Sequence, residues 1–361
     1  MAKFLRFSAI LLWTLLTVVG PSAAQAKKRV ESSPALGFKT LWDPSTPAAV
    51  IDAAVSVFEI RMVSEEPSKY FTNLEQIGAE NLRERILNSA RYDNHEKLVF
   101  ERQIDHCLRE SLLEKCPLMM IRERGTGFLL GAGGRSFWTN AHVVARYLKM
   151  LSQLEGVSVD TLLEKPVWLP LFLFNNKGEL VVDPFVHRPM LVKVPSLTRL
   201  AQTRDSFYAE DSDYVMIELA VPIGEPLEIA ATLNIGEPVS RLGYPACTNC
   251  SDNKNEPGNE LKRDRGENKN SSGKILYWTS GKVQTDDWGL EFLNQPRVEL
   301  VEDSLRTIFF YDADGQHGMS GGPVLNDAGE VIGLHSGNKG KLDASGELRV
   351  LSRAVRPAEF N

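Results

Sequence analysis

The chain has little that would tie it to a polyanion, a repeated array or a cofactor. Its 361 residues carry a formal net charge of −6, with 41 basic against 47 acidic residues. Such a weak charge bias gives no argument for nucleic acid as a partner. No internal repeat is present, which argues against solenoids and propellers. No motif for a cofactor or a metal dominates the sequence, so we expect neither.

The chain also lacks an apolar run long enough to cross a membrane. Its longest candidate, residues 7–20, follows two basic residues and precedes the small-residue site Ala24-Gln25-Ala26. A spanning helix needs about 20 apolar residues, whereas this arrangement is typical of a secretory signal peptide at residues 1–26. A membrane anchor is the alternative. We expect export to the periplasm or the cell exterior, with no membrane anchor in the mature form.

Cysteine is scarce. The four cysteines form two local pairs, Cys107 with Cys116 and Cys247 with Cys250. In an exported chain, a disulfide within each pair is the simplest of three connectivities. The CTNC string of the second pair could instead be redox-active, or join the other cysteines and a histidine such as His95 in a metal site. A redox CxxC opens a helix after a strand, whereas this one enters a polar segment, which favours the disulfides.

One serine near the C-terminus lies within a cluster of glycines. The string reads GMSGGPV, with Ser320 preceded by Gly318-Met319 and followed by two glycines. Glycines accept a positive φ, so successive backbone N–H groups can turn toward one point beside the serine hydroxyl. An oxyanion would develop at that point in an acyl-transfer reaction. Ser320 is therefore a candidate nucleophile that needs a base elsewhere in the chain.

Two upstream segments supply a base and a carboxylate. The string GTGFLLGAGGRSFWTNAHVV predicts two strands joined by a glycine turn and ending at His142. The string DSDYVMIELA alternates with strand period, and Asp213 shares the parity of its inward-facing residues, as does the alternative Asp211. A serine nucleophile needs an imidazole to accept its proton and a carboxylate to orient that imidazole. We therefore predict a triad of His142, Asp213 and Ser320.

These strings and their order resemble the chymotrypsin-fold, trypsin-like serine proteases of the compact bacterial type. The resemblance covers residues 49–361 in outline and is dense only around the three segments. It implies an all-β fold of two six-stranded antiparallel β-barrels. It also implies a secreted or periplasmic serine endopeptidase that hydrolyses proteins or peptides without a cofactor. In this family, the N–H groups at the positions of Gly318 and Ser320 form the oxyanion hole.

The chain is longer than a minimal enzyme of this type, and the additions can be placed. Apolar residues at helical spacing predict a helical insertion at about 70–116, packed on the N-terminal barrel, with a propeptide or a partner-binding surface as the weaker alternative. A polar stretch at about 251–274 predicts a mobile loop. The expected organisation is a signal peptide at 1–26, an extension or short propeptide at 27–48, an N-terminal barrel at 49–225 that carries His142 and Asp213, and a C-terminal barrel at 226–361 that carries Ser320.

One departure from the trypsin pattern concerns activation. In animal trypsin-like zymogens, an aspartate directly before the nucleophile captures the newly cut amino terminus. Here that residue is Met319, and a thioether does not form an ion pair with an ammonium group. We therefore expect no activation through that ion pair, and we expect heterogeneous trimming of the mature N-terminus to leave activity intact.

A second departure concerns specificity. The string VIGLHSG would form the strand that walls the S1 pocket, and its His335 resembles the histidine in the IGIHWG string of glutamyl endopeptidases. A histidine can donate a hydrogen bond to a glutamate or glutamine at P1, the residue before the cleaved bond. Ser336, Gly337 and Gly315 would line the same pocket, although glutamyl endopeptidases tend to have a hydroxyl residue at the position of Gly315. Small apolar or unspecific P1 cleavage is the alternative.

Two other functions fit the sequence less well. A non-catalytic binding protein on a protease fold would be expected to have lost a triad member, and all three are present. An esterase of the α/β-hydrolase type has its nucleophile between a strand and a helix and its histidine last in the chain. Here the histidine comes first.

Overall fold

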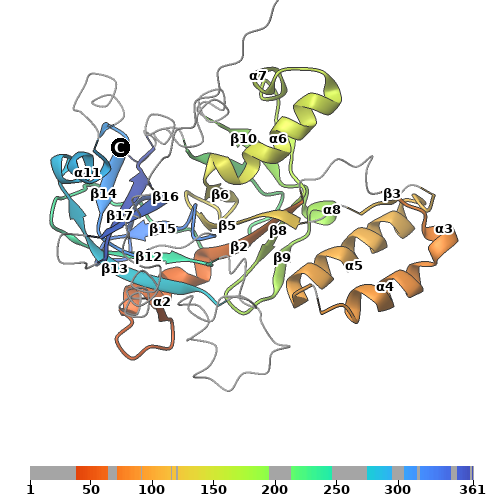
Figure 1. Cartoon of the computed structure of the whole chain (residues 1–361), viewed down its shortest axis with the longest axis horizontal. Coiled ribbons are helices and arrows are strands. Elements are labelled where there is room, and N and C mark those ends of the chain that lie inside the picture. Colours follow the sequence, from red (N-terminus) through yellow and green to blue (C-terminus); the bar gives the residue numbers. More distant parts are fainter. Residues whose placement is uncertain are drawn as a thin grey trace, which may run out of the picture. The chain divides into compact units, whose positions relative to one another are not determined.

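The fold is known from a computed structural model. It describes residues 38–63, 71–90, 92–114, 116–118, 121–194, 213–245, 275–294, 305–314, 318–342, 348–357 and 360. Most of its strands belong to two antiparallel sheets (Figure 1). The expected all-β, chymotrypsin-like fold with a helical insertion is confirmed. The expected signal peptide at 1–26, the polar stretch 251–274 and the Cys247–Cys250 pair lie outside the described residues.

The C-terminal sheet closes into a barrel of six strands. Their order is β13-β12-β15-β16-β17-β14, and β14 pairs back with β13. A seventh strand, β1, from the beginning of the described chain, adds to β13. The bounds are β1 Lys39–Thr40, β12 Pro238–Gly243, β13 Tyr277–Gln284, β14 Ile308–Tyr311, β15 Pro323–Leu325, β16 Val331–Leu342 and β17 Leu348–Val355.

The N-terminal sheet has the order β7-β10-β11-β6-β5-β2-β8-β9. Its strands β7 and β8 are consecutive in the chain, separated only by Leu169 and Pro170, yet β7 pairs with β10 and β8 with β2. The sheet therefore curls so far that consecutive strands of the chain lie at opposite ends of its strand order, β7 at one edge and β8 next to the other edge. No pairing among its described strands closes it into a barrel. The bounds are β2 Val57–Val63, β5 Ile121–Leu129, β6 Ser136–Thr139, β7 Val167–Trp168, β8 Leu171–Phe174, β9 Leu180–Val182, β10 Met190–Lys193 and β11 Val215–Glu218.

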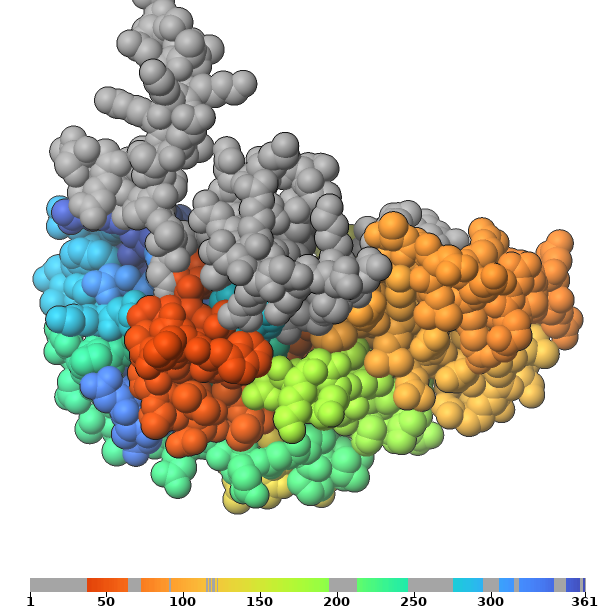
Figure 2. Space-filling view, turned by 90° about the horizontal axis from the view of Figure 1, so that it is seen from below, coloured from red at the N-terminus to blue at the C-terminus, as the bar shows by residue number. Residues whose placement is uncertain are grey.

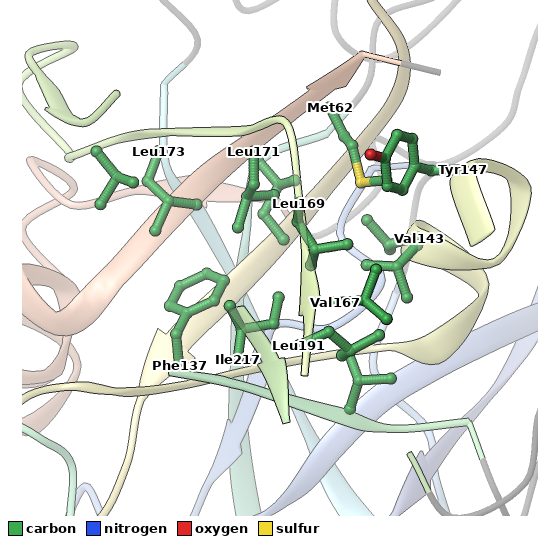
Figure 3. Close-up of a cluster of buried hydrophobic side chains, with 14 of the residues drawn as sticks. Met62, Phe137, Val143, Tyr147, Val167, Leu169, Leu171, Leu173, Leu191 and Ile217 are labelled. Carbon is green, nitrogen blue, oxygen red and sulfur yellow. The ribbon is translucent and has the colours of Figure 1, made fainter. Parts of the chain in front are cut away.

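An apolar core fills this curl and fixes helix α6 (Ala141–Glu155). Figure 3 shows side chains of the strands converging on those of the helix, and the labelled ones include Met62, Phe137, Leu171, Leu191 and Ile217 from the sheet and Val143 and Tyr147 from α6. Burial of each such side chain contributes about 1.5–3 kcal/mol. Because His142 lies in the first turn of α6, the core that holds the helix also holds that histidine.

The other helices outside the insertion are short. They are α2 Ala48–Ala53, the 3₁₀ helix η2 Ala54–Ser56, α7 Val159–Leu162, α8 Pro184–His187 and α11 Asp286–Leu293. None of the helices in the described ranges combines the length and the apolar composition that crossing a bilayer requires.

The insertion has a small core of its own. It consists of β3 (Phe71–Thr72), α3 (Leu74–Ile77), α4 (Ala79–Leu87), α5 (Asn94–Arg109) and β4 (Cys116–Pro117). Figures 1 and 2 show these elements in orange, with α4 and α5 side by side in Figure 1. The buried side chains Leu74, Ile86, Phe100 and Ile104 pack around the Cys107–Cys116 disulfide, which confirms the first expected pairing. The apolar stripe therefore packs mostly within the insertion and only in part, through Val99, on the barrel.

Charged groups complete the attachment of α5 to strand β2. Arg61 of β2 is fully buried, and it donates to Glu59 at 2.6 Å and to Asp93, the N-cap of α5, at 2.9 Å. His95 of α5 contacts the other Glu59 oxygen at 2.9 Å. Burial is the largest single influence and acts to raise the pKa of Asp93, but Arg61, the Glu96 N–H and Arg124 together outweigh it, and the pKa is lowered. The insertion and the barrel thus share one buried ionic network.

Candidate active site

His142 and Asp213 are in direct contact. Asn140 ends the strand segment of β6 and is the N-cap of α6, which places His142 at the helix start. The His142 ring Nδ1 lies 2.8 Å from Asp213 Oδ2, and the His142 backbone N–H donates to Asp213 Oδ1 at 3.0 Å. The Asp213 side chain is 3% exposed and that of His142 is 37% exposed. One carboxylate therefore fixes both the backbone and the ring of an accessible histidine.

Asp213 is itself fixed by the same element. The side-chain amide of Asn140 donates to the Asp213 backbone carbonyl at 2.6 Å. Strand β11 starts two residues later and pairs with β6, with Val215 opposite Thr139. The sequence prediction of Asp213 agrees with this geometry, while the alternative Asp211 lies outside the described residues.

The turn that carries Ser320 packs against the end of β6. Gly321 has a φ of 83°, and a Cβ at this position would come within 2.2 Å of Thr139 Oγ1 and 2.3 Å of the Thr126 carbonyl oxygen. Only glycine fits there. Because β6 leads directly into His142, this close approach brings the serine turn of one sheet to the histidine end of the other. Ser320 itself is partly buried.

Thr126 of β5 ties this turn to both sheets. Its side chain is fully buried. Its Oγ1 donates to the Gly318 carbonyl at 2.8 Å and accepts from the Tyr244 N–H at 2.9 Å. Its own N–H donates to the Ser320 carbonyl at 2.9 Å, and its carbonyl accepts from Thr139 Oγ1 at 2.7 Å. The position of the Gly318–Ser320 backbone therefore depends on one threonine, which sequence reasoning missed. A polar residue between two glycines in the GTGF string was the available signal.

Behind the serine turn lies a buried group of Arg241, Tyr311 and His335. His335 of β16 is 1% exposed. Its Nδ1 lies 2.6 Å from the Tyr311 hydroxyl, and its Nε2 lies 3.2 Å from Arg241 Nη1. Burial first, and then the charges of Arg241, His142 and Arg353, hold the pKa of His335 well below its ordinary value of 6.5. The imidazole is therefore neutral at physiological pH.

Arg241 brings a charge into this group without a matching carboxylate. Its side chain is fully buried on β12, and among the described residues no acidic group lies within ion-pair distance of it. Its Nη2 donates to the Met319 sulfur at 3.4 Å, and its Nε has no hydrogen-bond partner. Burial lowers the pKa of Arg241, while Tyr311 and Asp314 act in the opposite direction. Burial also raises the pKa of Tyr311 to about 12, with Arg241 opposing.

The other residues assigned to the S1 pocket are placed less directly. Ser336 follows His335 and is buried, and its Oγ donates to the Arg353 carbonyl at 3.4 Å. Gly337 lies opposite Arg353 in the pairing of β16 with β17. Gly315 lies outside the described residues, so its assignment stays a prediction.

The cysteines and histidines of the insertion do not gather around a metal. Within the described ranges, no group of three or more potential ligands of the His, Cys, Asp or Glu type has the required spacing. Cys107 is bonded to Cys116, and the His95 ring stacks on Phe174 at 4.0 Å between centroids. These contacts give both residues a structural role.

The position of Thr126 predicts a measurable loss of stability. Thr126→Val keeps the side-chain shape but leaves the buried Gly318 carbonyl and Tyr244 N–H without their partner, which costs about 1–3 kcal/mol for each group. Chemical denaturation should show a lower free energy of unfolding by about 2 kcal/mol or more. Thr126→Ser keeps the hydroxyl and is the matched control, with a smaller loss. Equal losses in both variants would contradict the assigned hydrogen bonds.

Comparison with known proteins finds one family model and a number of similar solved structures. A family model described as the trypsin-like peptidase domain matches residues 125–334, which is more than half of the chain. No curated protein matches the chain in sequence. Among solved structures, the Rv3671c protease from M. tuberculosis in its active form is 16% identical, over 98% of this chain and 91% of that chain, with a TM-score of 0.38. The serine endoprotease from Yersinia pestis is 14% identical, over 85% of this chain and 61% of that chain, with a TM-score of 0.37. On the family match, the chain belongs to the trypsin-like peptidases.

Proposed function

We propose that the protein is a serine endopeptidase in which Ser320 is the nucleophile, His142 the general base and Asp213 the group that orients the base. The observation that carries this proposal is the 2.8 Å contact between His142 Nδ1 and Asp213 Oδ2 at the end of the strand against which the Ser320 turn packs. With Nδ1–H donated to the carboxylate, Nε2 is the acceptor that a serine hydroxyl requires.

Each step of the reaction then has a group to perform it. Ser320 Oγ attacks the peptide carbonyl carbon while His142 Nε2 accepts the hydroxyl proton. His142 returns this proton to the leaving amine, which leaves an acyl-enzyme on Ser320. A water molecule attacks the ester, with His142 again as base, and releases the carboxylic acid product. The N–H groups of Gly318 and Ser320 are the proposed donors to the oxyanion, and Thr126 supports the backbone between them.

Replacement of the nucleophile tests this assignment. Ser320→Ala should lower kcat for a peptide substrate by about a million-fold, because the attacking oxygen is absent. A fluorophosphonate probe should label the wild-type protein at Ser320 and should not label the variant. Ser158→Ala, at the exposed N-cap of α7, is the control and should keep both labelling and turnover. Labelling of another serine, or hydrolysis by Ser320→Ala, would overturn the proposal.

We also propose that the enzyme prefers an acidic or amide side chain at P1, with glutamate favoured. His335 is joined on one side to Tyr311 and on the other to Arg241. The Arg241 guanidinium can only donate, so the Nε2 that lies 3.2 Å from it is an acceptor, and the neutral ring carries its proton on Nδ1, toward the Tyr311 hydroxyl. The guanidinium of Arg241 is then the group that would donate to a P1 oxygen. A buried guanidinium without a counter-charge is costly, and a P1 carboxylate near it would reduce that cost. Charge therefore favours glutamate over its amide.

The P1 proposal predicts a selective effect of Arg241. Arg241→Met removes the charge at a similar volume and should reduce kcat/KM for P1 glutamate about 10- to 100-fold relative to P1 glutamine. The measurement is cleavage of peptides that differ only at P1, with Glu, Gln, Ala or Lys. Arg135→Met removes an arginine that is half-exposed and should leave the Glu-to-Gln ratio unchanged. A flat or basic P1 profile of the wild-type enzyme would reject this preference while leaving the triad proposal intact.

Export is proposed on the N-terminal sequence and is consistent with the disulfide Cys107–Cys116, since such bonds persist in oxidising compartments. Cleavage after Ala26 would give a mature chain that starts at Lys27. Amino-terminal sequencing of the protein from a periplasmic or extracellular fraction should find this residue or one shortly after it. Recovery of the intact chain only from the cytoplasm would contradict export.

A further inference from the structure

The first described residues of the chain lie against the residue that precedes Ser320. Strand β1 pairs with β13 so that Lys39 lies opposite Trp278 and Thr40 opposite Tyr277. Phe38, directly before this strand, is 8% exposed and packs in one cluster with Tyr277 and Met319. The rings of Phe38 and Tyr277 meet edge to face, with centroids 6.5 Å apart. An aromatic side chain from the start of the mature protein thus reaches the nucleophile turn.

Met319 is confined on its other sides. Its side chain is fully buried. Gly243 of β12 makes room for it, since a Cβ on Gly243 would lie 2.8 Å from the Met319 Cβ. Its sulfur accepts from Arg241 Nη2 at 3.4 Å, and its carbonyl accepts from the Gly322 N–H at 3.1 Å. Phe38 adds to this surrounding from a segment far from Met319 in the chain.

We propose that Phe38 is a positioning residue for catalysis, which acts by holding Met319 and, through it, the backbone N–H of Ser320. This inference rests on the proposed function, because it assumes that Ser320 is the nucleophile and that its N–H binds the oxyanion. The N–H of Ser320 belongs to the peptide bond that joins it to Met319. Fixing the Met319 side chain therefore limits the orientations of that peptide, and an oxyanion donor is effective only when its orientation is fixed beforehand.

Contacts of its own residues anchor the segment that carries Phe38. Thr46 Oγ1 donates to the Thr40 carbonyl at 3.0 Å and accepts from Trp278 Nε1 at 3.0 Å. The Lys39 ammonium lies 5.1 Å from the centre of the Trp278 ring and donates to Ser45 at 2.8 Å. Figure 2 shows this first segment, in red, at the molecular surface. These contacts hold the segment in the position from which Phe38 reaches Met319.

The test compares turnover with folding in the full mature chain. Phe38→Ala should lower kcat about tenfold or more with little change in KM. It should also weaken inhibition by a peptide aldehyde, whose adduct carries an oxyanion, by a similar factor. Phe38→Leu restores apolar volume and should recover most of the activity. Trp42→Ala removes a 68% exposed aromatic side chain of the same segment and serves as the control, with kcat unchanged.

The outcomes separate positioning from mere stabilisation. Rates are measured well below the melting temperature, and competent sites are counted by titration with the fluorophosphonate probe. If Phe38→Ala lowers the melting temperature but keeps kcat per titrated site and aldehyde affinity, the inference is wrong. If the wild-type protein is not labelled at Ser320, the proposed function fails instead, and the two failures are thereby distinguished.

Discussion

The close approach of the two sheets at Thr126 is the constraint on which the candidate site depends. The N-terminal sheet contributes His142 and Asp213, and the C-terminal sheet contributes the turn that carries Ser320. The site is complete only when the two sheets are fixed relative to each other. The threonine meets this need with four hydrogen bonds, and Gly321 allows the contact because it has no side chain. A buried polar hub of this kind stabilises one arrangement strongly, since any shift leaves several groups without partners.

A second principle is the use of buried charge without full compensation. Arg241 is more expensive to bury than an apolar residue of the same size, and the barrel would be more stable without it. Under the proposed P1 preference, a substrate carboxylate would offset part of that cost. His335 stays neutral beside it, so the positive charge is concentrated on a residue that cannot lose its proton at physiological pH. His335 thus contributes hydrogen bonds without a charge, and Arg241 contributes the charge.

The sequence was most informative where the residues of the candidate site lie in short sequence motifs. The contact of His142 with Asp213, at the end of the strand against which the Ser320 turn packs, was predictable because local spacing and strand parity carry its signal. Arg241 was not, because its strand is buried on both faces after the first residue and so shows no alternation. Phe38 was not, because its contact with the nucleophile turn joins residues far apart in the chain. Such contacts follow from tertiary packing, which no local pattern contains.

The ionic network between β2 and α5 changes how the insertion should be regarded. Glu59 and Arg61 are withdrawn from water on a barrel strand, and part of their compensation, Asp93 and His95, comes from the insertion. Excision of the helices would remove the Asp93 and His95 partners of these two side chains. A variant without the helices would therefore need substitutions at both Glu59 and Arg61 at the same time. The insertion is thus an integral part of the fold, and a deletion alone would not remove it cleanly.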